Sequence, residues 1–267
     1  MTLPTPRTDS WALVTGASSG IGLELARGLA ERRHNLILVA RRLDRLKSLA
    51  LDLRIAGVAA EPFQCDLADP SRRADLLEHL RDKKISVLCN NAGFANFGNV
   101  ATVDPCAELR QIELNVTALA ELTYALVPAM VSRGSGAILM VGSTAGYQPV
   151  PGNATYSASK AFVHSFAQSL HTELHGTGVS CTLVTPGPVA TEFNETAGIV
   201  GGSDALLERI SMTPRQVADT ALRALGNHRR ICVPGTVAKV QVVGSALTPT
   251  PIMLPMLRRF TAGLQAG

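Results

Sequence analysis

The alternation of short apolar runs with helical segments constrains the fold of this chain more than any other feature. A continuous apolar run predicts a strand buried on both faces, whereas apolar residues three and four apart predict an amphipathic helix. Strands that alternate with helices imply right-handed crossovers and a parallel sheet covered by helices on both faces. Strands are predicted at Trp11–Thr15, Asn35–Ala40, Ala59–Leu67, Ile85–Cys89, Ala137–Val141, Val179–Val184 and Ile231–Val233. The 267 residues therefore predict one α/β, doubly wound, Rossmann-type domain over 1–267, with a sheet of about seven strands.

Capping residues mark where three of the helices begin. Asp69 and Asp104 are predicted N-caps, and each is followed by a proline at the first helical position. Thr213 and Gln216 form a predicted capping box around Pro214 and Arg215. The helices are predicted over residues 21–33, 43–56, from 70, from 105 to about 132, 155–175 and from 214.

Two segments have no clear element. Residues 188–212 form a long stretch between the sixth strand and a helix, and long loops in compact domains tend to be lids or binding loops. We therefore predict a lid-like substrate loop there. The C-terminal tail, residues 236–267, is apolar and contains Pro249, Pro251 and Pro255, a density of proline that breaks a spanning helix. Packing, an oligomer contact and a membrane surface remain open as its role.

Composition excludes several classes of function. The chain is 46% apolar with a mild net charge of +4, and its basic residues form no stripe, so we expect no nucleic-acid partner. The prolines of the apolar tail lead us to expect no transmembrane segment either. The first ten residues lack the apolar core of a secretory signal. Five cysteines without a C-x-x-C pair argue against a disulfide framework or a zinc site. A reducing, cytoplasmic location without a bound metal is the expectation.

A glycine-rich turn follows the first strand and opens the first helix. Glycine permits a sharp turn and a close approach of the backbone to a ligand. The free N–H groups and the positive end of the helix dipole at such a turn favour a pyrophosphate. The spacing is G-x-x-x-G-x-G, and its placement after a first strand predicts a dinucleotide site. The residues expected to contact the cofactor there are Gly16, Ser18, Ser19, Gly20, Ile21 and Gly22.

The end of the second strand indicates which dinucleotide is bound. An acidic residue there would hydrogen-bond the ribose hydroxyls of NAD, but the chain has Ala40, Arg41 and Arg42, with no carboxylate before Asp44. A guanidinium matches the geometry of a phosphate. We therefore predict NADP(H), with Arg41 as the main contact of the 2′-phosphate and Arg42 as possible support. The alternative is that one or both arginines only face solvent.

Tyr156 and Lys160 are candidates for acid–base chemistry. They lie four residues apart near the start of a long predicted helix, which places both on one face. Lowering the pKa of a tyrosine from near 10 to about 7 needs roughly 4 kcal/mol. A lysine cation about 4 Å away supplies a similar amount at an effective dielectric of about 20. Ser143 ends the fifth strand, at the edge of the sheet where ligands bind in such folds.

In combination these residues resemble the short-chain dehydrogenase/reductase family. The resemblance extends from about Trp11 to Thr191 and departs from no catalytic position of the family. It rests on the glycine turn together with Asp66, Asn90, Asn91, Ala92, Gly93, Asn115, Ser143, Tyr156, Lys160, Pro186 and Gly187.

The resemblance implies a role for each of these positions. Ser143 would orient a carbonyl, Tyr156 would protonate it, and Lys160 would bind the nicotinamide ribose. Asn115 would hold a water in a proton relay through Lys160. Asp66 would contact adenine, with Leu67 beside it in the cofactor site. The remaining expected cofactor contacts are Asn91, Ala92 and Gly93, and, at the nicotinamide end, Pro186, Gly187, Val189 and Thr191.

The reaction that the resemblance implies is hydride transfer between NADP(H) and a carbonyl or alcohol carbon. Candidate lining residues Phe94, Phe97, Tyr147 and Phe193 favour an apolar ketone, aldehyde or alcohol as the substrate. Family members commonly form homodimers or homotetramers through two long helices, here around residues 114–131 and 161–174. Two other functions stay open: an NADP(H)-sensing binding protein without catalysis, and an isomerase or dehydratase on the same scaffold.

His171 and His175 resemble a metal-binding pair because they lie four residues apart. The glutamate of an H-E-x-x-H motif is misplaced, and no third ligand is evident. We expect a solvated or interface helix face instead.

Overall fold

The computed structural model describes residues 3–193 and 211–264. Seven parallel strands form one sheet in the order β3-β2-β1-β4-β5-β6-β7. The order reverses between β1 and β4, which is where a doubly wound sheet opens a crevice for a ligand. The strands are β1 (Ser10–Thr15), β2 (Asn35–Ala40), β3 (Ala60–Gln64), β4 (Lys84–Asn90), β5 (Gly136–Val141), β6 (Val179–Val184) and β7 (Ile231–Cys232). The predicted fold class is confirmed, and each predicted strand is present with shifted ends at most.

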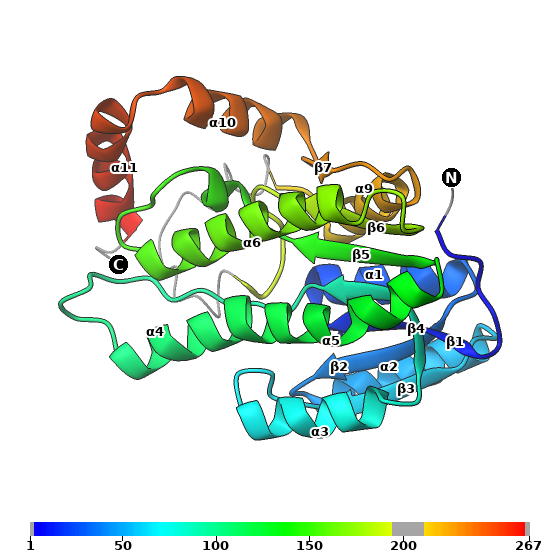
Figure 1. Cartoon of the computed structure of the whole chain (residues 1–267). Coiled ribbons are helices and arrows are strands. Elements are labelled where there is room, and N and C mark those ends of the chain that lie inside the picture. Colours follow the sequence, from blue (N-terminus) through cyan, green and yellow to red (C-terminus); the bar gives the residue numbers. More distant parts are fainter. Residues whose placement is uncertain (1–2, 194–210, 265–267) are drawn as a thin grey trace.

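Helices cover both faces of the sheet (Figure 1). They are α1 (Gly20–Glu31), α2 (Leu43–Ile55), α3 (Pro70–Leu80), α4 (Pro105–Ile112), α5 (Leu119–Ser132), α6 (Ala154–Glu173), α9 (Pro214–Gly226), α10 (Thr236–Leu247) and α11 (Thr250–Leu264). A π-helical turn, η1 (Glu113–Ala118), joins α4 to α5, and a 3₁₀ turn, η2 (Thr144–Tyr147), follows β5.

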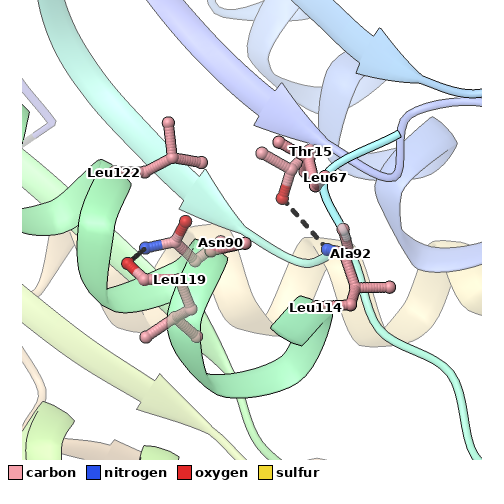
Figure 2. Close-up of a pocket in the computed structure, with 8 residues that line it drawn as sticks. Thr15, Leu67, Asn90, Ala92, Leu114, Leu119 and Leu122 are labelled. Carbon is pink, nitrogen blue, oxygen red and sulfur yellow. Dashed lines mark hydrogen bonds between the residues drawn. The ribbon is translucent and has the colours of Figure 1, made fainter. Parts of the chain in front are cut away.

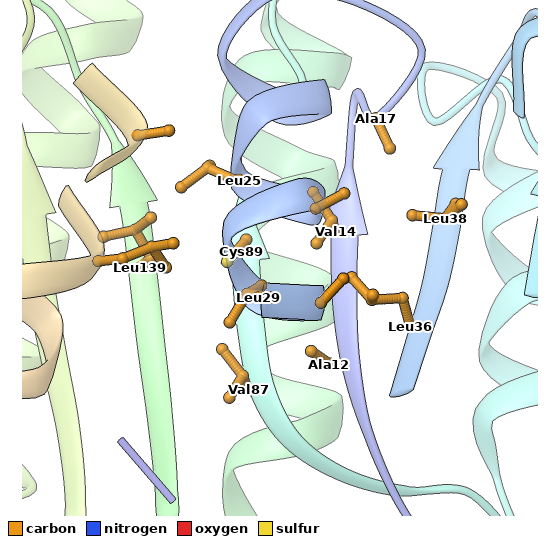
Figure 3. Packing of buried hydrophobic residues seen from close by; sticks show 14 of the residues in the cluster. Ala12, Val14, Ala17, Leu25, Leu29, Leu36, Leu38, Val87, Cys89 and Leu139 are labelled. Atoms are coloured by element: carbon orange, nitrogen blue, oxygen red, sulfur yellow. The ribbon is translucent and has the colours of Figure 1, made fainter. Parts of the chain in front are cut away.

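Side chains that alternate along the strands build two separate cores. Ala12 and Val14 of β1 face α1, α2 and α9, whereas Leu13 between them faces α3, α5 and α6. Figure 3 shows the first core, where Leu25 and Leu29 of α1 pack over the sheet. Because both faces are buried, these strands have continuous apolar sequences instead of alternating ones.

The predicted helix starts are confirmed by their hydrogen bonds. The carboxylate of Asp69 accepts from the backbone N–H of Ser71, and that of Asp104 accepts from the N–H of Cys106. Thr213 and Gln216 form the reciprocal capping box that the sequence predicts.

The long helix after Asp104 differs from the prediction at its centre. A continuous α-helix was expected from residue 105 to about 132, but η1 interrupts it between α4 and α5. By length and hydropathy alone, Pro105–Ser132 would be long enough to cross a membrane. Leu119, Leu122 and Met130, however, pack into the second core, as expected of a helix that lies against a sheet.

The C-terminal tail forms two helices, which the sequence analysis did not predict. The helix α10 ends at Leu247, just before Pro249, and α11 contains Pro255. The chain therefore turns near the first of its three prolines, as the steric restrictions of proline require. The predicted loop at 188–212 lies mostly outside the described residues, and its two described ends pair through a bridge between Val189 and Met212.

Candidate active site

The carboxyl ends of the strands bring most of the predicted site residues to one edge of the sheet. The glycine turn follows β1, the two arginines follow β2, and Asn91–Gly93 follow β4. Ser143 follows β5, Pro186 follows β6, and the first turns of α6 present Tyr156 and Lys160.

The glycine turn has the backbone geometry that the sequence implied. Gly16 and Gly20 have φ angles of +68° and +56°, in the left-handed region that side chains rarely adopt. Gly22 is required for another reason, because a Cβ there would lie 2.3 Å from the carbonyl oxygen of Gly16. The turn is thus held close against α1, and Ser19 precedes the first residue of that helix without capping it. These features fit the cradle that a pyrophosphate needs.

Arg42, and not Arg41, lies against this turn. The Arg42 guanidinium donates to the hydroxyls of Ser18 and Ser19, with a shortest distance of 2.7 Å, and pairs with Glu192. Arg41 is exposed, and within residues 3–193 and 211–264 its backbone carbonyl accepts from the side chain of Gln64 while its guanidinium makes no hydrogen bond. The geometry therefore shifts the expected phosphate contact from Arg41 toward Arg42.

The hydroxyl of Thr15 ties β1 to the segment after β4. It donates to the carbonyl of Cys89 and accepts from the backbone N–H groups of Asn91 and Ala92, each at 3.0 Å. Figure 2 shows the bond to Ala92. The amide of Asn91 also donates to the Thr15 carbonyl at 2.9 Å. Asn91 and Ala92 thus fix the floor of the crevice between the two strands.

A small cavity lies behind this floor. Its volume is about 10 Å³, and Thr15, Asn90, Leu114 and Leu119 are among the residues that line it (Figure 2). A space of that size accommodates about one water molecule, so it is no substrate site. Leu67 also lines it and packs into the second core, which places the Leu67 side chain away from the open edge.

Asn115 lies inside the π-helical turn and connects two parts of the site. Its side-chain oxygen accepts from the N–H of Phe94 at 3.1 Å, and its amide donates to the Phe94 carbonyl and to Ser159. A Cβ on Gly93 would lie 3.1 Å from the Asn115 oxygen and 3.4 Å from Lys160 Nζ. Glycine at this position therefore lets Asn115, Lys160 and the backbone of the Asn91–Gly93 segment pack together.

Ser143 is held rigidly at the end of β5. The residues on either side of it bond to β6 and to the segment that continues from it. The backbone N–H of Gly142 donates to the carbonyl of Val184, and that of Thr144 donates to the carbonyl of Pro186. Its hydroxyl accepts from the N–H of Ala145 and is hydrogen-bonded to Tyr156. The serine and the tyrosine are therefore already positioned to share one ligand oxygen.

Tyr156 and Lys160 are buried side by side on α6. Lys160 Nζ donates to the carbonyl of Val141 at 2.9 Å and lies 5.6 Å from the centre of the Tyr156 ring. Burial raises the pKa of Tyr156 to about 12, an effect that the Ser143 hydrogen bond opposes. Burial lowers the pKa of Lys160 to about 8.

These pKa directions correct one expectation. The spacing made it energetically feasible for the Lys160 cation to lower the pKa of Tyr156 toward 7, whereas burial raises that pKa in the folded chain. The ammonium is engaged by a backbone carbonyl instead of the phenol, and removal of the phenol from water dominates its pKa. At neutral pH the phenol is protonated, the form that can donate a proton.

An unpredicted residue, His164, supports the serine from behind. Ser143 N–H lies 3.5 Å from His164 Nε2, and the Tyr147 ring packs on the imidazole with centroids 4.5 Å apart. A Cβ on Gly142 or Gly146 would come within 2.8 Å of the imidazole. Tyr147 was predicted to line the substrate site. In the structure its ring packs on the His164 imidazole. Nothing in the sequence pattern distinguishes His164 except its place one turn after Lys160.

Apolar side chains surround the tyrosine. Ala95, Phe97, Ala145 and Phe193 pack with it, and the Phe193 ring lies 5.6 Å from the Tyr156 ring. Phe97 and Phe193 thus lie where a substrate-lining role requires, whereas Phe94 contributes its backbone to Asn115.

A larger cavity of about 280 Å³ lies beside the segment that follows β6. It is lined by Gly187, Pro188, Met212, Gln216, Pro234, Gly235, Thr236, Val237 and Ala238. None of these side chains carries a charge. Val189 forms the bridge to Met212, and a Cβ on Gly20 would come within 3.1 Å of the Thr191 methyl group. The segment after Pro186 therefore runs from this cavity back to the glycine turn.

Asp66 and the histidine pair have other partners. The Asp66 carboxylate pairs with Arg110 at 2.7 Å and accepts from the N–H of Ala68. His171 contacts the carbonyl of Cys181 at 2.8 Å. Among residues 3–193 and 211–264, no group of three or more histidine, cysteine or acidic residues could hold a metal ion.

This constellation has a counterpart among known families. The sequence model of the short chain dehydrogenases matches residues 10–198. The chain belongs to the short-chain dehydrogenase family. Its oxidoreductases use a nicotinamide dinucleotide, in agreement with the crevice described above.

Individual relatives of this short-chain dehydrogenase differ in what their names say they act on. A protein from Chromohalobacter salexigens named sulfoacetaldehyde reductase 2 is 38% identical over 215 residues, which cover 78% of this chain and 84% of that protein. A short-chain dehydrogenase from Sphingobium yanoikuyae, solved in complex with NADPH, is 37% identical with a TM-score of 0.78, over 89% of this chain and 93% of that one. A bulky-bulky ketone specific alcohol dehydrogenase from Comamonas testosteroni is 29% identical with a TM-score of 0.74, over 100% and 97% of the two chains.

Proposed function

We propose that this short-chain dehydrogenase uses NADP(H) to interconvert an apolar ketone or aldehyde and its alcohol. The observation that carries the proposal is the group formed by half-buried Ser143 and buried Tyr156 and Lys160, at the same edge of the sheet as the glycine turn. When bound, the nicotinamide would supply or accept the hydride. The residues of this chain position the substrate and move the proton.

Tyr156 is the proton donor in the reductive direction. Its phenol is protonated at neutral pH, because burial raises its pKa to about 12. Ser143 is fixed by strand pairing on both sides, so its hydroxyl can donate to the same carbonyl oxygen at little reorganisation cost. As charge develops on that oxygen, the serine hydrogen bond and the transferred proton stabilise it.

Lys160 stabilises the tyrosinate that remains. Its pKa of about 8 lies above neutral pH, so the ammonium is charged when the phenolate forms. Proton return needs a path to solvent. The side chain of Asn115 is occupied by Phe94 and Ser159, so we assign the relay water to backbone carbonyls of the π-helical turn, where hydrogen bonding is irregular.

The preference for NADP(H) is supported by Arg42 and by the NADPH complex of the Sphingobium relative. A guanidinium at the end of β2 offers a charge-assisted contact to a 2′-phosphate. No acidic residue lies at that position, where a carboxylate would select NAD.

An apolar substrate is supported by the side chains around Tyr156. Ala95, Phe97 and Phe193 present hydrocarbon to the phenol, and the cavity of about 280 Å³ beside Gly187 carries no charge on its described residues. The name of the Comamonas relative, a bulky ketone dehydrogenase, agrees with such a site. A sulfonated aldehyde, as in the name of the Chromohalobacter relative, would need a cation that these residues do not provide.

We place the activity in the cytoplasm. All five cysteines are free thiols, and burial raises the pKa of Cys89 and Cys181 to about 12, which protects them from reaction.

The test is consumption of NADPH by the purified protein with a panel of bulky ketones, apolar aldehydes and sulfoacetaldehyde. We expect turnover of the apolar carbonyls, and a loss of about 10²–10⁴-fold in kcat in Tyr156→Phe without a change in the Kd for NADPH. Turnover that persists in Tyr156→Phe would show that Tyr156 is not the proton donor. Preferential turnover of sulfoacetaldehyde would overturn the substrate class.

A further inference from the structure

Glu192 forms a bridge across the cofactor crevice. One of its carboxylate oxygens lies 2.7 Å from Arg42 Nη1, and the other lies 2.7 Å from Arg45 Nη1. Arg42 follows β2, Arg45 is in the first turn of α2, and Glu192 belongs to the segment after β6. Residues nearly 150 positions apart in the sequence therefore meet beside the glycine turn.

Two arginines that hold one carboxylate form a site with the charge and geometry for an anion. The same Arg42 guanidinium donates to Ser18 and Ser19, so its position is fixed by the glycine turn as well. A carboxylate and a phosphate present similar acceptor oxygens to a guanidinium. The two arginines hold the pKa of Glu192 below its usual value, so the group is ionised at neutral pH.

The neighbours of Glu192 contact the site on both sides. The Thr191 methyl group lies over Gly20, and the Phe193 ring packs on Tyr156. Any displacement of Glu192 is therefore coupled to residues that touch the glycine turn and the proposed acid.

We propose that Glu192 is a specificity-determining residue that competes with the 2′-phosphate of the dinucleotide for Arg42 and Arg45. This inference rests on the proposed use of NADP(H). In the free protein the carboxylate pairs with both arginines and offsets one of their two positive charges. A dinucleotide with a 2′-phosphate displaces it, and one without that phosphate leaves the bridge in place. Glu192 thus weakens binding of NADP(H) and sets how strongly the protein prefers it over NAD(H).

The experiment is calorimetric binding of two fragments, adenosine 2′,5′-bisphosphate and ADP, to the wild type and to Glu192→Gln. Glutamine keeps the size of the side chain and removes its charge. We expect the Kd of the bisphosphate to fall about fivefold, the size expected for release of two partly exposed ion pairs. The Kd of ADP should change by less than about twofold, because ADP does not compete for the arginines.

Glu31→Gln is the matched control. It removes the same charge from an exposed carboxylate that pairs with Arg215 at the other end of α1. Neither fragment should bind it differently from the wild type. An unchanged or weaker bisphosphate affinity in Glu192→Gln would overturn the competition, and a weaker one would make Glu192 a strap that closes over the bound cofactor. Equal wild-type affinities for NADPH and NADH would instead overturn the proposed use of NADP(H), which separates the two failures.

Discussion

Two neighbouring arginines at the end of β2 have very different surroundings. Arg41 is exposed, whereas Arg42 contacts the two serines of the glycine turn and Glu192. From the sequence, Arg41 was expected to be the main contact of the 2′-phosphate. The contacts of a side chain depend on which way the chain turns after the strand, and that direction is not encoded in the order of two identical residues.

We expect Arg42→Ala to weaken NADPH binding more than Arg41→Ala does. A charge-assisted hydrogen bond contributes about 1.5–3 kcal/mol, so the Kd for NADPH should rise about 10–100-fold in Arg42→Ala. Fluorescence titration with NADPH and NADH measures both variants. The affinity for NADH should change little, because NADH carries no 2′-phosphate. The reverse ranking of the two variants would restore Arg41 as the main contact.

The catalytic group itself was accessible from the sequence. Tyr156 and Lys160 are one helical turn apart, and Ser143 ends a strand that must point to the same edge of the sheet. The spacing alone could not predict the direction in which the pKa of Tyr156 shifts. Burial of the tyrosine and the bond from Lys160 to Val141 exist only in the folded chain, and they reverse the pKa shift that spacing alone suggested.

At the scale of the helices and strands, hydrophobic periodicity predicted the seven strands and the helices up to α9, but neither of the C-terminal helices α10 and α11. The π-helical turn around Asn115 escaped it, because Pro105–Ser132 is apolar and helical in period throughout. The cause of the turn is tertiary: the Asn115 side chain is bonded to Phe94 and Ser159 on other segments. Such contacts join residues that no local pattern connects. For the same reason, His164 could not be distinguished from any other residue of its helix.

His164 links the stability of α6 and the end of β5 to pH. Burial, together with the Lys160 charge, lowers its pKa to about 4. In the unfolded chain His164 is protonated as the pH falls below about 6.5, whereas in the folded chain it stays neutral until about pH 4. The resulting stability is present above pH 6.5 and is lost as the pH falls toward 4.

We expect the free energy of unfolding to fall by about 2 kcal/mol more in the wild type than in His164→Gln between pH 7 and pH 5. Glutamine keeps an acceptor for the N–H of Ser143 but does not titrate. Urea unfolding at the two pH values gives the difference. His34, also buried with a pKa lowered to about 4, contributes its own share and is unchanged in both proteins. If the free energy of unfolding fell equally in both proteins, protonation of His164 would not destabilise the fold.

At the scale of the whole molecule, apolar side chains are exposed on two separate faces. One face lies on α4, α5 and α6, where Tyr124 is 66% exposed and Leu109 and Phe162 are also exposed. The other lies on α10, where Val240 and Leu247 are 71% and 77% exposed. Figure 1 shows α10 on the opposite side of α6 from α4 and α5. Exposed apolar side chains gathered on one face indicate an interaction site.

We propose that the face on α4, α5 and α6 is the contact of a homodimer. Its two longer helices, α5 and α6, carry a cluster of aromatic rings: Phe166 packs against both Tyr124 and Phe162, with centroids 5.7 and 5.5 Å apart. Aromatic residues are enriched at the centres of protein interfaces. A glutamate there would be buried without a partner on association, which costs several kcal/mol per copy.

Sedimentation of three proteins distinguishes the two faces. The wild type should be a dimer or larger at micromolar concentration, Tyr124→Glu should shift strongly toward monomer, and Val240→Glu on α10 should sediment like the wild type. The two substitutions add the same charge at positions of similar exposure, one on each face. A monomer caused by Val240→Glu alone would move the contact to the C-terminal helices. A wild type that is monomeric would mean that neither face joins copies of this chain.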